Sequence, residues 1–193
     1  MSPLAAKPTM YKLKLPLIGE PSVGKTTLVK AFMGGTLTDR YSPTLGVEIG
    51  RKMVNIDLDG QPVEVYFQLW DLGGQASFKT IRGTYYKGAQ GLVLVYDIGR
   101  HSTFLECEKW LGEAWGITGQ VPLVLVGNKL DLRQKGEGEV TTEDGKSYAK
   151  NIQEQTSLMT PFIEASAIRA RNADTPFKEL AKVILRRILD KAE

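Results

Sequence analysis

The strongest chemical signal in the sequence is residues 19–26, GEPSVGKT, which match the phosphate-binding pattern G-x-x-x-x-G-K-T. Its glycines let the backbone turn so that several N–H groups converge on phosphate oxygens, and the helix that follows adds positive partial charge. In this arrangement Lys25 would reach the β- and γ-phosphates, and the Thr26 hydroxyl would bind Mg²⁺. Pro21 has no N–H, so we expect the donors of the cradle to lie later, from Val23 to Thr26.

Residues 70–75, WDLGGQ, carry a second set of groups suited to phosphate chemistry. At the end of a strand, Asp71 would hold Mg²⁺, often through a water molecule. Gly74 would offer its N–H to a γ-phosphate, and Gln75 would orient an attacking water. A D-x-x-G sequence alone is equally typical of a turn, but its position after a phosphate loop favours the functional interpretation.

Residues 128–131, NKLD, directly follow an apolar run and suit the recognition of a purine base. A carboxylate at Asp131 accepts hydrogen bonds from the N1–H and 2-amino groups of guanine, a pair of donors that adenine lacks. The methylene groups of Lys129 would lie against the base. On its own, this tetrapeptide would be interpreted as a polar turn at the end of a strand.

Strands and helices alternate along the chain and place these motifs at strand ends. Asp59-Gly60 is a strong hairpin signal, and two continuous apolar runs are typical of strands buried on both faces. We therefore expect an α/β fold, with a mostly parallel six-stranded sheet, one antiparallel edge strand and helices on both faces. The expected strands cover residues 11–18, 48–58, 62–69, 91–96, 122–126 and 162–165, and the expected helices cover residues 26–33, 77–87, 104–114, 142–155 and 177–188.

The composition is that of a globular chain and excludes several classes of protein. Hydrophobic residues make up 42% and charged residues 24% of the 193 residues, so we expect one domain at 11–193 after a flexible head at 1–10. One cysteine, Cys107, and one histidine, His101, exclude an intramolecular disulfide and a His/Cys metal cluster. A net charge of +3 is too small to indicate a nucleic-acid partner.

No targeting or membrane signal is visible in the sequence. The apolar runs reach about six residues, whereas a helix that spans a bilayer needs about 20. The first ten residues lack the apolar core of a secretory signal, and the last four contain no cysteine for a prenyl group. We expect a cytoplasmic protein without a lipid anchor, and peripheral membrane association stays open but unsupported.

In this order, the three motifs resemble the Ras superfamily of small GTPases, and the resemblance covers residues 11–190. Residues 41–48 (YSPTLGVE), 70–78 (WDLGGQASF) and 84–97 (TYYKGAQGLVLVYD) are most similar to Rab-type members, whereas the Gly-Gly-Gln at 73–75 resembles Arf-type members. The resemblance implies a P-loop G domain that binds GTP or GDP with Mg²⁺ and hydrolyses GTP slowly. Such a domain acts as a molecular switch in signalling or trafficking.

The resemblance also assigns roles to individual residues. It implies that Gln75, Lys25 and Thr44 act in catalysis, and that Thr26, Thr44 and Asp71 hold the metal. Thr44 follows Thr26 by 18 residues, which suits two hydroxyls meeting at one Mg²⁺. The implied nucleotide contacts are Gly19, Pro21, Ser22, Val23, Gly24, Lys25, Thr26, Thr27, Tyr41, Thr44, Gly74, Asn128, Lys129, Asp131, Ser166 and Ala167. Effectors, exchange factors and activating proteins would bind residues 40–50 and 72–86 of a monomer.

Four positions depart from the pattern of the family. Ile168 stands where many members have lysine, and Leu37 where many have a phenylalanine against the base, which predicts weaker nucleotide binding. Ala76 replaces a glutamate that contributes to the action of exchange factors in relatives. Pro21 stands where relatives usually have glycine or a small polar residue, and there it would crowd Gln75 or an incoming arginine.

Two other functions stay open. In the first, the chain is a scaffold whose nucleotide is structural and is hydrolysed little or not at all, an alternative that Pro21 favours. In the second, it is a phosphotransferase on the same phosphate loop. That enzyme would need an acceptor site and usually a lid, and no segment suggests either.

Several conspicuous residues have simpler interpretations. We expect Cys107 to be buried on a helix, Trp110 and Trp115 to pack in the core, and His101 to lie at the surface near a helix start. Residues Phe78, Ile81 and Tyr85 would form a surface for partners. We expect Lys182, Arg186 and Arg187 to form a solvated helix face, and Arg40 is a weaker candidate for an arginine finger in cis.

Overall fold

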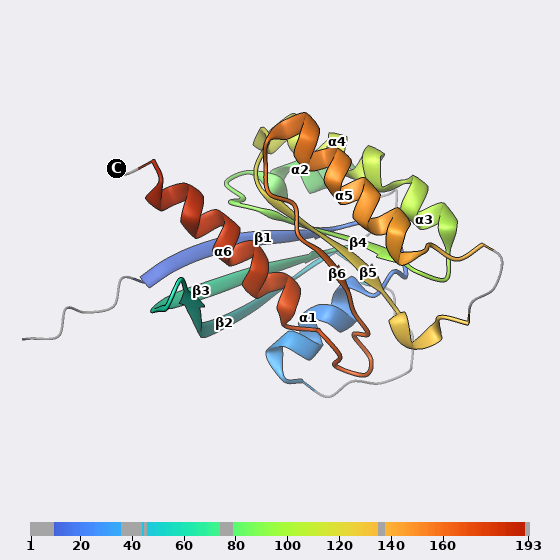
Figure 1. Cartoon of the computed structure of the whole chain (residues 1–193), viewed down its shortest axis with the longest axis horizontal. Helices are drawn as coiled ribbons and strands as arrows, with labels where there is room; N and C mark the ends of the chain where they lie inside the picture. Colours follow the sequence, from blue (N-terminus) through green and yellow to red (C-terminus); the bar gives the residue numbers. More distant parts are fainter. Residues whose placement is uncertain (1–9, 36–43, 45, 74–78, 135–137, 192–193) are drawn as a thin grey trace, which may run out of the picture.

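A six-stranded sheet forms the centre of the computed structural model, which describes residues 10–35, 44, 46–73, 79–134 and 138–191 (Figure 1). Its order is β2-β3-β1-β4-β5-β6, and only β2 runs antiparallel to its neighbour. The expected mostly parallel sheet with an antiparallel edge strand is therefore confirmed. The strands are β1 (Met10–Ile18), β2 (Val47–Leu58), β3 (Gln61–Leu72), β4 (Leu92–Asp97), β5 (Leu123–Asn128) and β6 (Phe162–Glu164).

Helices cover both faces of the sheet. In Figure 1, α1 and α6 lie on one face, whereas α2, α3, α4 and α5 lie on the other. The helices are α1 (Lys25–Met33), α2 (Lys79–Tyr86), α3 (His101–Leu105), α4 (Cys107–Thr118), α5 (Thr142–Thr156) and α6 (Thr175–Leu189), and a 3₁₀ turn, η2, covers Leu130–Leu132. Among the described residues, no helix is long and apolar enough to cross a membrane.

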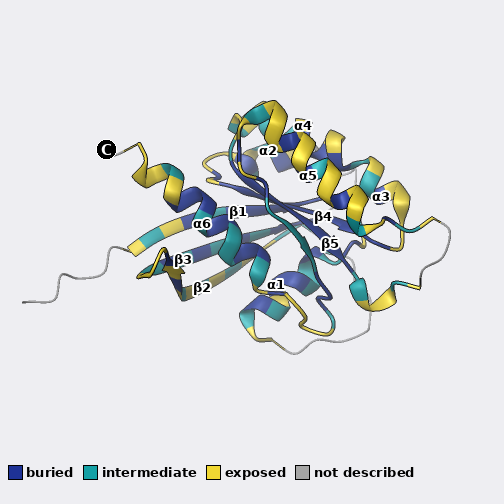
Figure 2. Ribbon diagram, viewed as in Figure 1, coloured by how far each residue is buried: buried dark blue, intermediate teal, exposed yellow. Residues whose placement is uncertain are grey.

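The apolar pattern explains this layering. In β1, Leu13, Leu15 and Leu17 alternate onto the face covered by α1 and α6, where they are buried in one core. Every residue of β4 and β5 is buried, as expected for central parallel strands with helices on both sides (Figure 2). The β2–β3 hairpin turns at Asp59 and Gly60, which both have positive φ (54° and 85°), the conformation that a two-residue hairpin turn requires.

Small differences from the expected elements concern their ends. β1 begins at Met10, one residue earlier than expected, and β3 continues to Leu72, so Asp71 lies within the strand. The helical stretch after β4 is divided at Glu106 into α3 and α4. The carboxyl ends of β1, β3, β5 and β6 lead into the motifs predicted to bind nucleotide, which places these motifs along one edge of the sheet.

Candidate nucleotide-binding site

The phosphate loop begins where β1 ends and leads directly into α1. Gly19, Ser22 and Gly24 have positive φ angles of 133°, 63° and 99°, so the loop curls back before the helix begins at Lys25. A side chain at position 19 would place its Cβ 2.1 Å from the carbonyl oxygen of Val95, on the neighbouring strand β4. Glycine is therefore required there by packing as well as by backbone conformation.

Lys25 lies inside this loop and is only 7% exposed. Its Nζ donates hydrogen bonds to the carbonyl oxygens of Gly19 (2.7 Å) and Glu20 (3.0 Å). Burial lowers the pKa of Lys25 from 10.5 to about 8, and the nearby Asp71 and Glu20 carboxylates oppose that shift. An anionic phosphate would complete the compensation of this buried charge.

Three oxygen-bearing side chains converge next to Lys25. The hydroxyls of Thr26 and Thr44 lie 2.6 Å apart, and Thr26 Oγ1 donates to Asp71 Oδ2 at 2.5 Å. Asp71 is 1% exposed, and burial raises its pKa. Its other oxygen, Oδ1, is buried with no hydrogen-bond partner among the described residues. The structure thus brings together the three residues expected to hold a metal.

These oxygens suit a hard cation such as Mg²⁺. Mg²⁺ prefers oxygen ligands and is usually held by one or two carboxylates, with water and substrate phosphates in its remaining positions. The unpartnered Asp71 Oδ1 is a buried acceptor for which a cation or a cation-bound water would provide the missing partner. Within the described part of the chain, no group of three His, Cys, Asp or Glu side chains forms an all-protein metal site.

The base motif begins at Asn128, which is buried at the end of β5. Its Nδ2 donates to the carbonyl oxygen of Val23 in the phosphate loop (2.8 Å), and its Oδ1 accepts from the N–H of Ala167 (3.1 Å). A Cβ on Gly24 would lie 2.3 Å from Asn128 Nδ2, so this contact needs glycine at position 24. Asn128 therefore ties three of the predicted site segments together.

Asp131 and Ser166 meet at the opposite end of the same motif. Ser166 Oγ donates a short hydrogen bond to Asp131 Oδ1, and Ser166 is itself 1% exposed whereas Asp131 is exposed. The buried serine thus orients an accessible carboxylate, the group expected to read guanine. The N–H of Ala167 is already bonded to Asn128, and the adjacent Ile168 is half-buried.

Two functional candidates, Asp97 and Arg100, were missed at the sequence level. Asp97 is 4% exposed at the end of β4, and its carboxylate pairs with Lys129 Nζ (2.7 Å) and Arg100 Nε (3.0 Å). Arg100 also donates to the carbonyl oxygen of Pro21 at 2.9 Å. The sequence signal that could have found Asp97 is an acidic residue at the end of the apolar run 91–96.

Several predicted residues lie outside the described part of the chain. Tyr41, Gly74 and Gln75 are among them, as are Leu37, Arg40, Ala76 and Phe78, so their roles stay predictions.

The structure also places the residues that were given simpler roles. Cys107 is buried, His101 is exposed at the start of α3, and the indoles of Trp110 and Trp115 pack into the core, as expected. In the proposed partner surface, Ile81 is 45% exposed and the Tyr85 ring lies 5.9 Å from that of Trp70.

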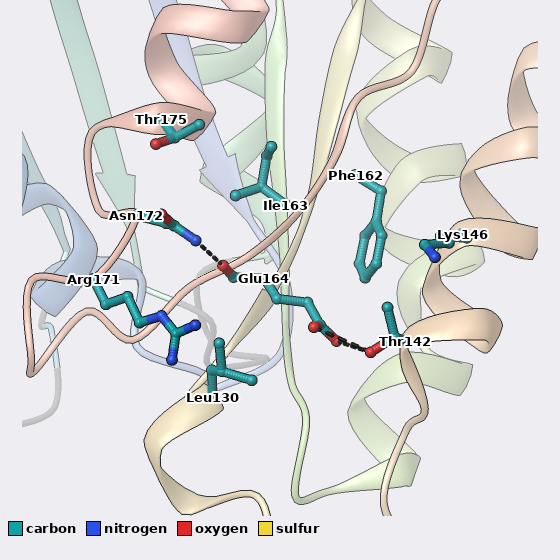
Figure 3. A pocket seen from close by; sticks show the side chains of 9 residues that line it. All are labelled: Leu130, Thr142, Lys146, Phe162, Ile163, Glu164, Arg171, Asn172 and Thr175. Carbon is teal, nitrogen blue, oxygen red and sulfur yellow. Dashed lines mark hydrogen bonds between the residues drawn. The ribbon is translucent and has the colours of Figure 1, made fainter.

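A shallow pocket of about 330 Å³ lies beside the edge strand β6 (Figure 3). Glu164 lies in its wall and accepts hydrogen bonds from Thr142 (3.0 and 3.1 Å). Its carboxylate also accepts hydrogen bonds from both terminal nitrogens of Arg133 (3.1 and 2.6 Å). These contacts join the residue directly after η2 to β6 and α5. None of the predicted site residues that the structure describes lines this pocket.

Comparison with known proteins agrees with the resemblance deduced from the motifs. Residues 14–186 match the family model described as "Ras family". The chain is 40% identical over 177 residues to the Ras-related protein RABA1b of Arabidopsis thaliana, covering 91% of this chain and 76% of that protein. It is 38% identical over 183 residues to the Ras-related proteins Rab11D and Rab11E of Lotus japonicus, covering 94% of this chain and 78% of each. The chain therefore belongs to the Ras family and is a Rab-like small GTPase.

Proposed function

We propose that this GTPase binds GTP and GDP between the phosphate loop and the 128–131 motif, and that the residues described above carry out slow GTP hydrolysis. One observation carries the assignment: Thr26, Thr44 and Asp71 converge beside the buried amine of Lys25. By analogy with other GTPases, the unassisted rate would be on the order of 10⁻⁴ to 10⁻² per second.

The residues of the chain divide the work of hydrolysis. Lys25 exchanges the carbonyl oxygens of Gly19 and Glu20 for oxygens of the β- and γ-phosphates, and so stabilises the charge that develops on them. Thr26, Thr44 and Asp71 would hold Mg²⁺, which neutralises charge on the same oxygens when it is bound. Gln75 would orient the attacking water.

The switch would work through the loss of the γ-phosphate. Thr44 belongs to the segment before β2, and its hydroxyl contacts the Thr26 hydroxyl at 2.6 Å. A γ-phosphate would hold Thr44 and the N–H of Gly74 together, and its release would free both segments. We propose that effectors, exchange factors and activating proteins read this difference at residues 40–50 and 72–86, on a monomeric cytoplasmic protein whose G domain covers 11–193.

Nucleotide competition tests the assignment of the base site. We expect GTP to displace labelled GDP efficiently and ATP to displace it poorly. Asp131→Asn should shift the preference toward xanthine nucleotides, because the amide both donates and accepts where the carboxylate only accepts. Asp190→Asn, which changes an exposed carboxylate directly after α6, is the matched control. Equal competition by ATP, or unchanged guanine selectivity in Asp131→Asn, would contradict the proposal.

Pro21 also supports the scaffold as a second candidate. The proline removes one N–H from the loop, and its carbonyl is held by Arg100 at 2.9 Å, which stiffens this side of the phosphate site. A single-turnover assay of the GTP-loaded protein separates the two functions. Phosphate release that is slowed by Gln75→Leu supports the switch, whereas no release over a day, with or without that substitution, supports the scaffold.

A further inference from the structure

A series of buried contacts leads from the phosphate loop into the helical layer. The carboxylate of Glu20 accepts a hydrogen bond from the indole Nε1 of Trp110 on α4, at 2.8 Å. The backbone carbonyl of the same Glu20 accepts from Lys25 Nζ, which also lies 5.9 Å from the centre of the Trp110 ring. Trp110 is 6% exposed. Glu20 is therefore hydrogen-bonded both to the Trp110 indole and to Lys25, the lysine expected to bind phosphate.

The contacts continue from Trp110 to the first turn of α2. The guanidinium carbon of Arg82 lies 4.3 Å from the centre of the Trp110 ring. Arg82 also forms a fork with Glu113 of α4, through Nε to Oε1 and Nη2 to Oε2, each at 2.9 Å. The hydroxyl of Tyr86, one turn further along α2, donates to the same carboxylate at 3.1 Å. Arg82 is only 4% exposed, so its whole side chain belongs to the packed interior.

This arrangement restricts where α2 can lie. A guanidinium that is both stacked on an indole and forked to a carboxylate has one favourable geometry. Moving α2 away would leave a buried charge without its partner, which is strongly unfavourable. Arg82 follows Gln75 by seven residues, so it determines where the segment that carries the water-orienting residue must end.

We propose that Arg82 is a positioning residue for GTP hydrolysis, which couples α2 to the phosphate loop through Trp110 and Glu20. When Lys25 turns toward a phosphate, it gives up its hydrogen bond to the backbone carbonyl of Glu20. Glu20 then shifts, and its carboxylate moves the hydrogen-bonded indole of Trp110, against which the Arg82 guanidinium lies. The coupling rests on the proposed function, because it needs a nucleotide at Lys25. Arg82 would therefore affect the rate of GTP hydrolysis without contacting the nucleotide.

The test uses variants that separate the fork from the rest of the helix. Arg82→Met keeps the length of the side chain but removes the charge and the fork, whereas Arg82→Lys keeps the charge as a single point without the planar stack. Tyr86→Phe is the matched control, since it removes another donor to Glu113 and leaves the Arg82–Trp110 stack in place. All are made in the full chain with Trp70→Phe and Trp115→Phe, so that Trp110 is the only tryptophan and can be excited selectively at its red edge.

Three quantities are measured for each variant: single-turnover GTP hydrolysis, GDP dissociation, and the Trp110 emission with GDP and with a non-hydrolysable GTP analogue. We expect the parent and Tyr86→Phe to show an emission difference between the two nucleotides. Arg82→Met should lose that difference and hydrolyse GTP roughly ten- to a hundredfold more slowly, as expected for a displaced catalytic segment. Its GDP dissociation should change less than about threefold, because the nucleotide contacts remain. Arg82→Lys should not restore the rate.

The results of these measurements support or overturn the positioning role of Arg82. If Arg82→Met hydrolyses GTP like Tyr86→Phe and keeps the emission difference, Arg82 is only structural and the inference is wrong. Full activity in Arg82→Lys would equally overturn the role of the fork. If Arg82→Met does not fold, Arg82→Lys and Glu113→Gln give the same comparison. A parent that neither binds nor hydrolyses GTP would overturn the proposed function and this inference together, whereas a normal parent confines the failure to Arg82.

Discussion

Asn128 Nδ2 donates a 2.8 Å hydrogen bond to the carbonyl oxygen of Val23, although 105 residues separate the two in the sequence. The oxygen of the same amide accepts from the N–H of Ala167. One buried side chain therefore joins the phosphate loop, the end of β5 and the loop after β6. A nucleotide bound in this site would meet phosphate contacts and base contacts that belong to one rigid unit.

Asn128→Ala should destabilise this unit. The substitution leaves the carbonyl of Val23 and the N–H of Ala167 buried without partners, so we expect the free energy of unfolding to fall by about 1–3 kcal/mol and GDP to dissociate faster. Urea denaturation and the release of fluorescent GDP measure the two effects. Gln153→Ala is the control, because its amide oxygen accepts from the N–H of Thr160 (3.4 Å) at an exposed position on α5. Equal losses in both variants would contradict the bridging role of Asn128.

Asp71→Asn should separate metal binding from stability. Burial raises the pKa of Asp71, which means that its charge is costly in the folded protein without a cation. The neutral amide should therefore leave the metal-free protein equally or more stable. It should also raise the Mg²⁺ concentration needed to retain GDP by about tenfold or more. Titration of Mg²⁺ against GDP release measures this, with Asp190→Asn as the control, and an unchanged Mg²⁺ requirement would contradict the proposed ligand role.

Lys25 should make the stability of the nucleotide-free protein depend on alkaline pH. Its pKa is lowered from 10.5 to about 8 by burial, so between these values the unfolded chain binds more protons than the folded one. Stability should therefore rise as pH increases through this window, by at most on the order of 3 kcal/mol, and fall again as pH returns to 8.

The measurement is the difference in unfolding free energy between the wild type and Lys25→Met on either side of that window. Taking the difference cancels the opposite effects of Cys107 and the buried tyrosines, whose pKa values are raised by burial. A difference that does not change with pH would show that Lys25 is not the buried cation described here.

The Cys107 thiol should be unreactive toward thiol reagents in the native protein. The thiol is 1% exposed, its Sγ lies 3.6 Å from the carbonyl oxygen of Thr103, and burial raises its pKa to about 12. Because the thiolate is the reactive form, we expect no reaction with Ellman's reagent at neutral pH and one equivalent in guanidinium chloride. Cys107→Ala provides the blank. Rapid stoichiometric reaction of the native protein would show that α4 opens locally.

Local patterns were sufficient to predict the strands, the hairpin and the nucleotide motifs. A G-x-x-x-x-G-K-T loop, a D-G turn between alternating segments and two apolar runs each depend on residues that are close in sequence, so the physical reason for each can be read directly. The pairing of β2 with β3 through Asp59-Gly60 and the burial of β4 and β5 agree with those predictions. The membership of the Ras family followed from the order of the same motifs.

Contacts between distant segments were decided only by the tertiary structure. Trp110 was expected only to pack in the core. Nothing in its spacing indicated that its indole donates a hydrogen bond to Glu20 or that the Arg82 guanidinium lies over its ring. In the same way, Asp97 joins Lys129 to Arg100 only because β4 and β5 end side by side. Periodicity tells which face of an element is apolar, but the sheet order and the packing of helices on it determine which polar groups meet across that face.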